Sequence, residues 1–326
     1  MKIAIVGVGA IGGLMGARLA ARGTHTISAL ARGPTLSQLR QHGWRLRSPD
    51  GDVQTAARAA EDPAELGVQD VVILAVKAPA LSALAHRLKP LLAPHTLIVP
   101  AMNGVPWWFC DRVASWGGSG LQSVDPQGEI ARHLPMAQVL GCVVHGSAST
   151  PEPGLVQHRM GRGLILGEPW GGRSERVQAL CDLLMDAGFE ATHSGHIRRD
   201  IWYKLWGNLT MNPVSALTGS TMDQVLADPL LLEFCSQAMR EASRIGARID
   251  CPVTQSPEER HAITRGLGAV KTSMLQDVEA GRPIELDAIV TAVHEIGTRL
   301  GEPMPTIGAL LGLTRVMARH RGLYPH

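Results

Sequence analysis

The sequence predicts an α/β protein in which an N-terminal doubly wound sheet is followed by an all-helical C-terminal domain. Through the first half, short apolar runs alternate with helical patterns, which is typical of parallel strands covered by helices. From about residue 174 the pattern becomes helical throughout. The 326 residues suit two domains. We place the boundary near Gly195, with one domain over residues 1–195 and the other over residues 196–326.

The elements of the first half are expected from their apolar runs. Five runs predict strands of one parallel sheet, over residues 3–6, 26–30, 70–76, 96–99 and 138–144. The stretch from residue 114 to 135 is rich in Gly and Ser and predicts a loop.

The elements of the second half are expected from helical periodicity and from the Gly and Pro residues that punctuate it. Five segments predict helices, over residues 173–187, 197–211, 223–247, 257–280 and 287–300. Gly219 and Pro252 lie between these segments, where helices commonly end.

The composition excludes several classes of protein. Lys and Arg number 31 and Asp and Glu 29, so neither nucleic acid nor an anionic membrane is an expected partner. The five cysteines are scattered without a CxxC pair, which favours reduced, buried thiols over disulfides or a metal site. No apolar run reaches the length of a membrane span and no signal-peptide pattern opens the chain. We therefore expect a cytoplasmic protein.

A glycine-rich turn follows the first expected strand, with the sequence Gly7-Val8-Gly9-Ala10-Ile11-Gly12. In such turns the first Gly permits the bend, the second lets the backbone approach a pyrophosphate, and the third lets the helix pack on the strand. A purely structural turn is the alternative. Its position between a strand and an Ala/Leu-rich helix favours a dinucleotide site on a Rossmann-type sheet.

Arg32 indicates which dinucleotide binds. NAD sites usually carry Asp or Glu at the end of the second strand, but residues 26–31 contain no acid and Arg32 follows them. A guanidinium suits a 2′-phosphate, so we predict NADP(H). The alternative is a solvated loop arginine.

Other polar residues follow expected strands, where ligands bind in such sheets. Lys77 follows the third strand, Asn103 the fourth, and His145 and Ser147 the fifth. Each alone could be an ordinary turn residue, but their shared location favours a ligand site.

One helix of the second half carries the most specific pattern. Lys204, Asn208 and Asn212 recur every fourth residue and share a face, while an apolar stripe that includes Trp202 and Trp206 takes another. A solvent-facing polar stripe is the alternative, although Asn gains little on an exposed helix.

Ser273 and Glu285 lie farther along the chain. Glu285 and Asp287 flank an expected helix start, where Asp287 is best explained as a cap. Glu285 precedes the cap and is not explained in that way.

Taken together, these motifs resemble the ketopantoate reductase family, nearly end to end. The resemblance implies that Lys204 donates a proton and that Glu285 orients the lysine or the nicotinamide ribose. It further implies that Asn208, Asn212 and Ser273 hold the substrate, and that Asn103 touches both substrate and cofactor. Cofactor contacts are implied for Gly7, Val8, Gly9, Ala10, Ile11, Gly12, Arg32, Lys77, Asn103, Ser147 and Glu285. The implied reaction is reduction of ketopantoate to pantoate by NADPH, in pantothenate biosynthesis, without a metal, in a monomer or homodimer.

Three departures concern the substrate pocket. Residues 289–292 replace an Asn-Gly pair common in the family, no Asn lies near Met222, and residues 105–135 add Trp107 and Trp108 beside Asn103. The alternatives are therefore an NADPH-dependent reductase of another small 2-oxo acid or of an imine, a non-catalytic NADPH-sensing protein, and a dehydrogenase of the 6-phosphogluconate type. The last would need a basic cluster near Lys204, which the sequence lacks.

Overall fold

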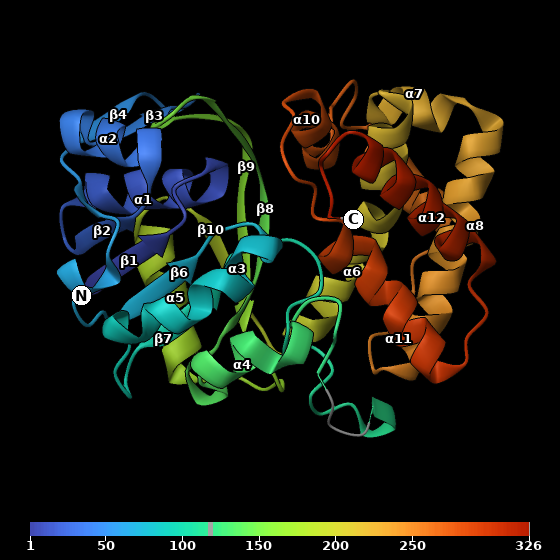
Figure 1. The fold of residues 1–326 in the computed structure, drawn as a ribbon, viewed down its shortest axis with the longest axis horizontal. Helices are drawn as coiled ribbons and strands as arrows, with labels where there is room; N and C mark the ends of the chain where they lie inside the picture. Colours follow the sequence, from blue (N-terminus) through green and yellow to red (C-terminus); the bar gives the residue numbers. More distant parts are fainter. Residues whose placement is uncertain (117–119, 326) are drawn as a thin grey trace. The chain divides into compact units, whose positions relative to one another are not determined.

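The computed structural model describes residues 1–116 and 120–325, which form two compact units (Figure 1). Unit 1 contains residues 1–102 and 127–200, and unit 2 contains residues 103–126 and 201–326. The division follows residue 200, and residues 103–126 group with the second unit although the sequence analysis left them in the first domain.

A five-stranded parallel sheet forms the first layer of unit 1. Its order is β5-β2-β1-β6-β7, and every neighbouring pair is parallel. Four expected strands are thereby confirmed, and the edge strand β5 is new because its sequence, Arg-Ala-Ala, carries no apolar run. The strands are β1 (Lys2–Val6), β2 (Thr26–Leu30), β5 (Arg58–Ala60), β6 (Val71–Leu74) and β7 (Leu97–Pro100).

A second sheet in unit 1 corrects the expectation for residues 138–144. These residues do not join the parallel sheet beyond an isolated bridge between Ile98 and Val139. They lead into β8, which forms a long antiparallel hairpin with β9, because Gly154 with φ +73° closes a tight turn between them. The sheet contains β3 (Trp44–Arg47), β4 (Val53–Thr55), β8 (Gly141–Glu152), β9 (Leu155–Gly167) and β10 (Glu190–Ser194).

Helix α1 (Ala10–Arg22) packs between these two sheets. Its Leu14, Met15 and Leu19 are fully buried in one core with β1 of the first sheet and Trp44 of the second. Burial of each such side chain contributes about 1.5–3 kcal/mol. The remaining helices of unit 1 are α2 (Gly33–His42), α3 (Ala78–Leu84), α4 (Glu129–His133) and α5 (Glu175–Asp186), and it also has short 3₁₀ turns over Pro63–Glu65, Ala85–Leu91, Pro126–Gly128 and Met136–Gln138.

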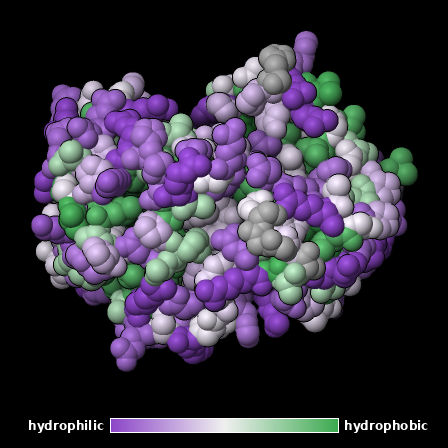
Figure 2. All heavy atoms as spheres, turned by 60° about the horizontal axis from the view of Figure 1, so that its bottom comes forward, coloured by the Kyte–Doolittle hydropathy of each residue, from purple (hydrophilic) through white to green (hydrophobic). Residues whose placement is uncertain are grey.

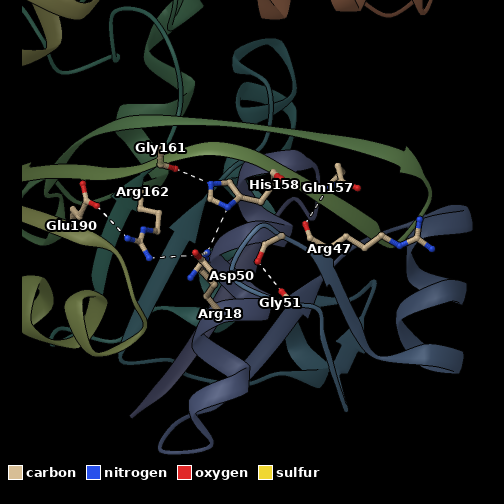
Figure 3. Close-up of polar contacts among 10 residues, drawn as sticks. Arg18, Arg47, Asp50, Gly51, Gln157, His158, Gly161, Arg162 and Glu190 are labelled. Atoms are coloured by element: carbon tan, nitrogen blue, oxygen red, sulfur yellow. Dashed lines mark hydrogen bonds and ion pairs between the residues drawn. The ribbon is translucent and has the colours of Figure 1, made fainter. Parts of the chain in front are cut away.

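Polar contacts tie α1 to the second sheet (Figure 3). Arg18 on α1 donates to Asp50 of the β3–β4 turn at 2.8 Å and lies 3.5 Å from Nδ1 of His158 on β9. Arg162, also on β9, lies 3.4 Å from Asp50 and 3.5 Å from Glu190 on β10. These contacts hold the turn and both strands against the helix that follows the glycine-rich turn.

Unit 2 is helical, as the sequence predicts, but its helices differ in extent. Helix α6 runs past its expected end and through Pro213. The segment 223–247 is split because Asp228 caps a new helix that begins at Pro229, and the segment 257–280 is split by a break that contains Gly268 with φ +74°. The helix that begins at Pro305 was not expected. The helices are α6 (Ile197–Thr218), α7 (Met222–Ala227), α8 (Pro229–Arg248), α9 (Pro257–Arg265), α10 (Ser273–Glu279), a π-helical stretch (Asp287–Thr291), α11 (Ala292–Leu300) and α12 (Pro305–His320), and a 3₁₀ turn covers Ala114–Trp116.

The surface is chemically mixed. In Figure 2 hydrophilic residues cover most of the face in view, and apolar residues appear in small separate groups. Within the described ranges, none of the helices combines the length and the apolar character needed to cross a bilayer.

Gly16 should tolerate no side chain, because a β-carbon there would lie 2.2 Å from the buried ring of Trp44. We expect Gly16→Ala to lower the free energy of unfolding by about 1–3 kcal/mol through overpacking. Gly312, also inside a helix, has no atom within 4 Å of the same position. There the identical change should stabilise the protein by about 0.5–1 kcal/mol. Urea unfolding followed by circular dichroism measures both, and equal effects at the two sites would contradict this packing.

Candidate functional site

The glycine-rich turn joins β1 to α1 and is closed by close backbone contacts. Gly7 has φ +90°, and a β-carbon there would lie 2.5 Å from Val76. A β-carbon at Gly12 would lie 2.0 Å from the carbonyl oxygen of Gly7. At Gly9, by contrast, no described atom lies within 4 Å of that position. The turn is therefore packed on its inner side and open at Gly9, next to the N-terminus of α1, where N–H groups favour an anion.

A pocket of about 420 Å³ opens beside this turn, within unit 1. It is bounded by the turn itself, by the end of β2, and by the segment from Val76 to Arg87. Arg32 lines it and makes no ion pair with any described residue. The lining residues are Gly7, Val8, Gly9, Leu30, Ala31, Arg32, Thr35, Glu61, Val76, Ala80, Ala83, Leu84 and Arg87.

Two charged residues of this pocket were missed by sequence reasoning. Glu61 follows β5, and the Nη2 atom of Arg87 lies 3.4 Å from its carbonyl oxygen. Because β5 has no apolar signature, nothing in the sequence placed Glu61 beside Arg32. Arg87 lies in a 3₁₀ segment whose pocket-facing side has no recognisable periodicity.

The other residues of unit 1 that were predicted to contact the cofactor do not line this pocket. Ala10 and Ile11 begin α1, and Lys77 is the half-buried cap residue of α3. Ser147, with His145, does not follow the end of a strand as expected. Strand β8 continues through both to Glu152 with a register shift between them, because the strand pairs with β9 along its length.

In unit 2, Lys204 lies on the partly accessible stripe of α6. Its Nζ donates to Oδ1 of Asn103 at 2.8 Å. Asn103 is followed by Gly104, which has φ +83°, and a β-carbon there would lie 2.4 Å from the carbonyl oxygen of Ala288. The N–H of Val105 then donates to the Ala288 carbonyl at 2.8 Å. Residues 103–105 thus contact both Lys204 and Ala288, which lie far from them in the sequence.

The two asparagines of the expected face differ in exposure. Asn208 is half-buried, whereas Asn212 is 4% exposed and its Nδ2 has no hydrogen-bond partner. A buried amide donor without a partner costs roughly 1–3 kcal/mol. A polar ligand group that accepted this hydrogen bond would remove the cost, so Asn212 indicates a binding position.

Ser273 and Glu285 have separate positions within unit 2. Ser273 is exposed at the first turn of α10, and the preceding Thr272 is held to Ser215 of α6 by a buried hydroxyl contact of 2.6 Å. Glu285 is half-buried and lies two residues before the π-helical stretch.

The explanation of Asp287 as a helix cap is not what the structure shows. Asp287 is the first residue of the π-helical stretch and accepts a hydrogen bond from the Tyr324 hydroxyl at 2.5 Å. Burial, with this hydrogen bond, raises the pKa of Tyr324 to about 12. The Ile289–Val290 pair that departs from the family pattern is buried in the same stretch.

Trp107 and Trp108, which the sequence placed beside Asn103, are 4% and 0% exposed and belong to the core of unit 2. Phe109 stacks on Trp202 at 5.9 Å between ring centroids. The aromatic residues anchor the segment that presents Asn103. Among the described residues no group of His, Cys, Asp and Glu could hold a metal ion.

Comparison with known proteins matches both halves of the chain to one family. The model of the ketopantoate reductase PanE/ApbA family matches residues 3–170, and the model of its C-terminal domain matches residues 196–318. A 2-dehydropantoate 2-reductase of Mesorhizobium japonicum is 42% identical over 325 residues, covering 99% of this chain and 100% of that protein.

Solved structures of similar proteins have the same fold. A protein of Ralstonia solanacearum MolK2, crystallised as a candidate ketopantoate reductase, has a TM-score of 0.95 at 54% identity and covers 99% of both chains. D-mandelate dehydrogenase, solved with NADH and anilino(oxo)acetate, shares the fold with a TM-score of 0.86 at 20% identity, covering 99% of this chain and 100% of that one.

Proposed function

Because this chain belongs to the ketopantoate reductase family and is an oxidoreductase of that family, we propose that it reduces ketopantoate to pantoate with NADPH, a step of pantothenate biosynthesis. The observation that carries the proposal is the hydrogen bond between Lys204 and Asn103, on the same helix face as Asn208 and the unpartnered amide of Asn212. We assign residues 1–195 to cofactor binding and residues 196–326 to substrate binding and catalysis.

The proposed roles follow from what each group can do. NADPH, when bound, supplies a hydride to the C2 carbonyl carbon of the substrate. Negative charge then develops on the carbonyl oxygen, and the Lys204 ammonium stabilises it and donates the proton. Asn103 orients that ammonium through its 2.8 Å hydrogen bond. Asn208, Asn212 and Ser273 hold the substrate by hydrogen bonds, and Glu285 orients the lysine or the nicotinamide ribose.

The residues proposed to contact the cofactor begin with the glycine-rich turn. The Gly7–Gly12 turn fits a pyrophosphate, since Gly9 is open and lies at a helix N-terminus. The further proposed cofactor contacts are Lys77, Ser147, Asn103 and Glu285.

Preference for NADPH rests on the charges of the pocket beside the turn. Two guanidinium groups, Arg32 and Arg87, line it against one carboxylate, Glu61. The surplus positive charge favours a 2′-phosphate over a bare ribose hydroxyl. Glu61 works in the opposite direction and should limit the preference.

We place the reaction in the cytoplasm, where thiols stay reduced, because all five cysteines are buried and none forms a disulfide among the described residues. The acting form is a monomer or a homodimer, with a small 2-oxo acid as its only ligand besides the cofactor.

The function is tested by steady-state NADPH oxidation with ketopantoate beside other 2-oxo acids. We expect ketopantoate to give the highest kcat/KM. If a bulkier or more apolar oxo acid gave a higher kcat/KM, that acid would be the substrate in place of ketopantoate, and the protein would still be a reductase of 2-oxo acids. NADPH binding without turnover of any oxo acid would indicate a binding protein and refute the proposal.

Arg32→Ala should shift cofactor choice. Loss of a charged hydrogen bond to the 2′-phosphate costs about 1.5–3 kcal/mol, so the NADPH to NADH ratio of kcat/KM should fall roughly 10- to 100-fold. Arg40→Ala is the matched control, since Arg40 lies on α2, the helix that Arg32 precedes as N-cap, but outside the pocket. If both variants keep the wild-type ratio, Arg32 does not read the phosphate.

Lys204→Ala should lower kcat by about 10²–10⁴, the usual contribution of a general acid. The dissociation constant for NADPH, measured by fluorescence titration, should stay within about twofold, which separates lost catalysis from lost folding. Lys89→Ala, an exposed lysine of unit 1, serves as the control. A loss of kcat below tenfold would remove Lys204 from this role.

A further inference from the structure

Arg260, on α9, borders the helix face that carries Lys204. Between Ile201 and Ala216 the partly accessible positions of α6 are Tyr203, Lys204, Gly207 and Asn208. A β-carbon at Gly207 would lie 3.0 Å from Nη2 and 3.1 Å from Nε of Arg260. The guanidinium therefore lies against α6 at Gly207, one position before Asn208 and one turn after Lys204.

The position of Arg260 is fixed by an aromatic ring. The guanidinium stacks 4.8 Å from the centroid of Tyr203, and its Nη1 donates to the Tyr203 hydroxyl at 3.2 Å. That hydroxyl in turn donates to Gln255 at 2.6 Å. Stacking and a neutral acceptor hold the group in place without neutralising its charge.

The charge of Arg260 has no carboxylate partner among the described residues. Its Nε is buried without a hydrogen bond, and no described group accepts from Nη2. The nearest acids in sequence are engaged elsewhere. Glu259 accepts from the Ser256 N–H at 2.7 Å in a capping box, and Glu258 pairs with Arg240 at 2.9 Å.

We propose that Arg260 binds the carboxylate of the 2-oxo acid, with Nη2, which has no acceptor among the described residues, as a donor. This assignment rests on the proposed function, because it requires an anionic substrate. A half-buried arginine without a counter-ion is costly, and a substrate carboxylate supplies the partner that guanidinium geometry favours. The asparagines and Ser273 are neutral, so Arg260 gives this face its second positive charge beside Lys204.

The packing of Arg260 on α6 also explains why position 207 is a glycine. A side chain there would push the guanidinium away from α6 and out of line with Asn208. The absence of a side chain in the middle of this helix, which weakens it by roughly 0.5–1 kcal/mol relative to Ala, is thus explained by the arginine packed on it.

Arg260→Gln tests the assignment against a substrate pair, the 2-oxo acid that the wild type reduces best and its primary amide. We expect KM for the acid to rise about 10- to 100-fold while kcat changes less than threefold. The amide, measured as a substrate or as a competitive inhibitor, should bind wild type and variant equally. Arg260→Lys should recover part of the acid affinity, and guanidinium ions should partly rescue Arg260→Ala.

Arg240→Gln is the matched control, because it removes an arginine of unit 2 whose charge is already paired with Glu233 and Glu258. NADPH affinity checks that each variant is folded. An unchanged KM for the acid, or an equal loss for acid and amide, overturns the role of Arg260 but leaves the reductase function standing. A loss confined to acids with a second carboxylate also overturns it, by placing a distal group at Arg260. A wild type that reduces no oxo acid refutes both proposals.

Discussion

Unit 1 depends on how closely α1 approaches the strands around it. Small residues make the approach possible, since β-carbons at Gly12, Gly13 and Gly16 would overlap Gly7, Val156 and Trp44. The first of these glycines closes the turn and the other two seat the helix on the second sheet. The same contact therefore stabilises the core and fixes the N–H groups that begin α1. A pyrophosphate site built in this way needs no charged side chain to position it.

In unit 2 the corresponding constraint is electrostatic. The ammonium of Lys204 is bonded to the neutral amide of Asn103, and the guanidinium of Arg260 is held by a phenol. A carboxylate beside Arg260 would neutralise its charge before a substrate arrived. The neutral phenol orients the guanidinium of Arg260 without neutralising it, as the carboxylate site proposed here requires.

Sequence reasoning succeeded where a local pattern has one structural meaning. The glycine-rich turn, four buried strands, and the spacing of Lys204, Asn208 and Asn212 are of this kind. It failed where the outcome depends on contacts far apart in the chain. The sequence of residues 138–144 is compatible with pairing in either sheet, and these residues lead into the second sheet because β8 forms a hairpin with β9. Glu61 and Arg260 belong to no recognisable motif. Glu61 is positioned by β5, which pairs with β2, and Arg260 by α9, which packs near α6. Nor did the pattern show that a break near Gly268 would separate α9 from α10 and leave Ser273 at a helix start.

The grouping of residues 103–126 with unit 2 bears on how the reaction is organised. Asn103 follows a strand of the parallel sheet, yet its side chain, its following glycine and the Trp107–Trp108 core all attach to helical elements. The Asn103–Lys204 pair is thus set inside one unit, and its 2.8 Å geometry does not depend on the other. If Lys204 is the proton donor, as proposed, its hydrogen bond to Asn103 is already formed in the absence of a cofactor. The residues proposed for cofactor choice, Arg32, Arg87 and Glu61, belong to unit 1, and those proposed for proton donation and carboxylate binding, Lys204 and Arg260, belong to unit 2.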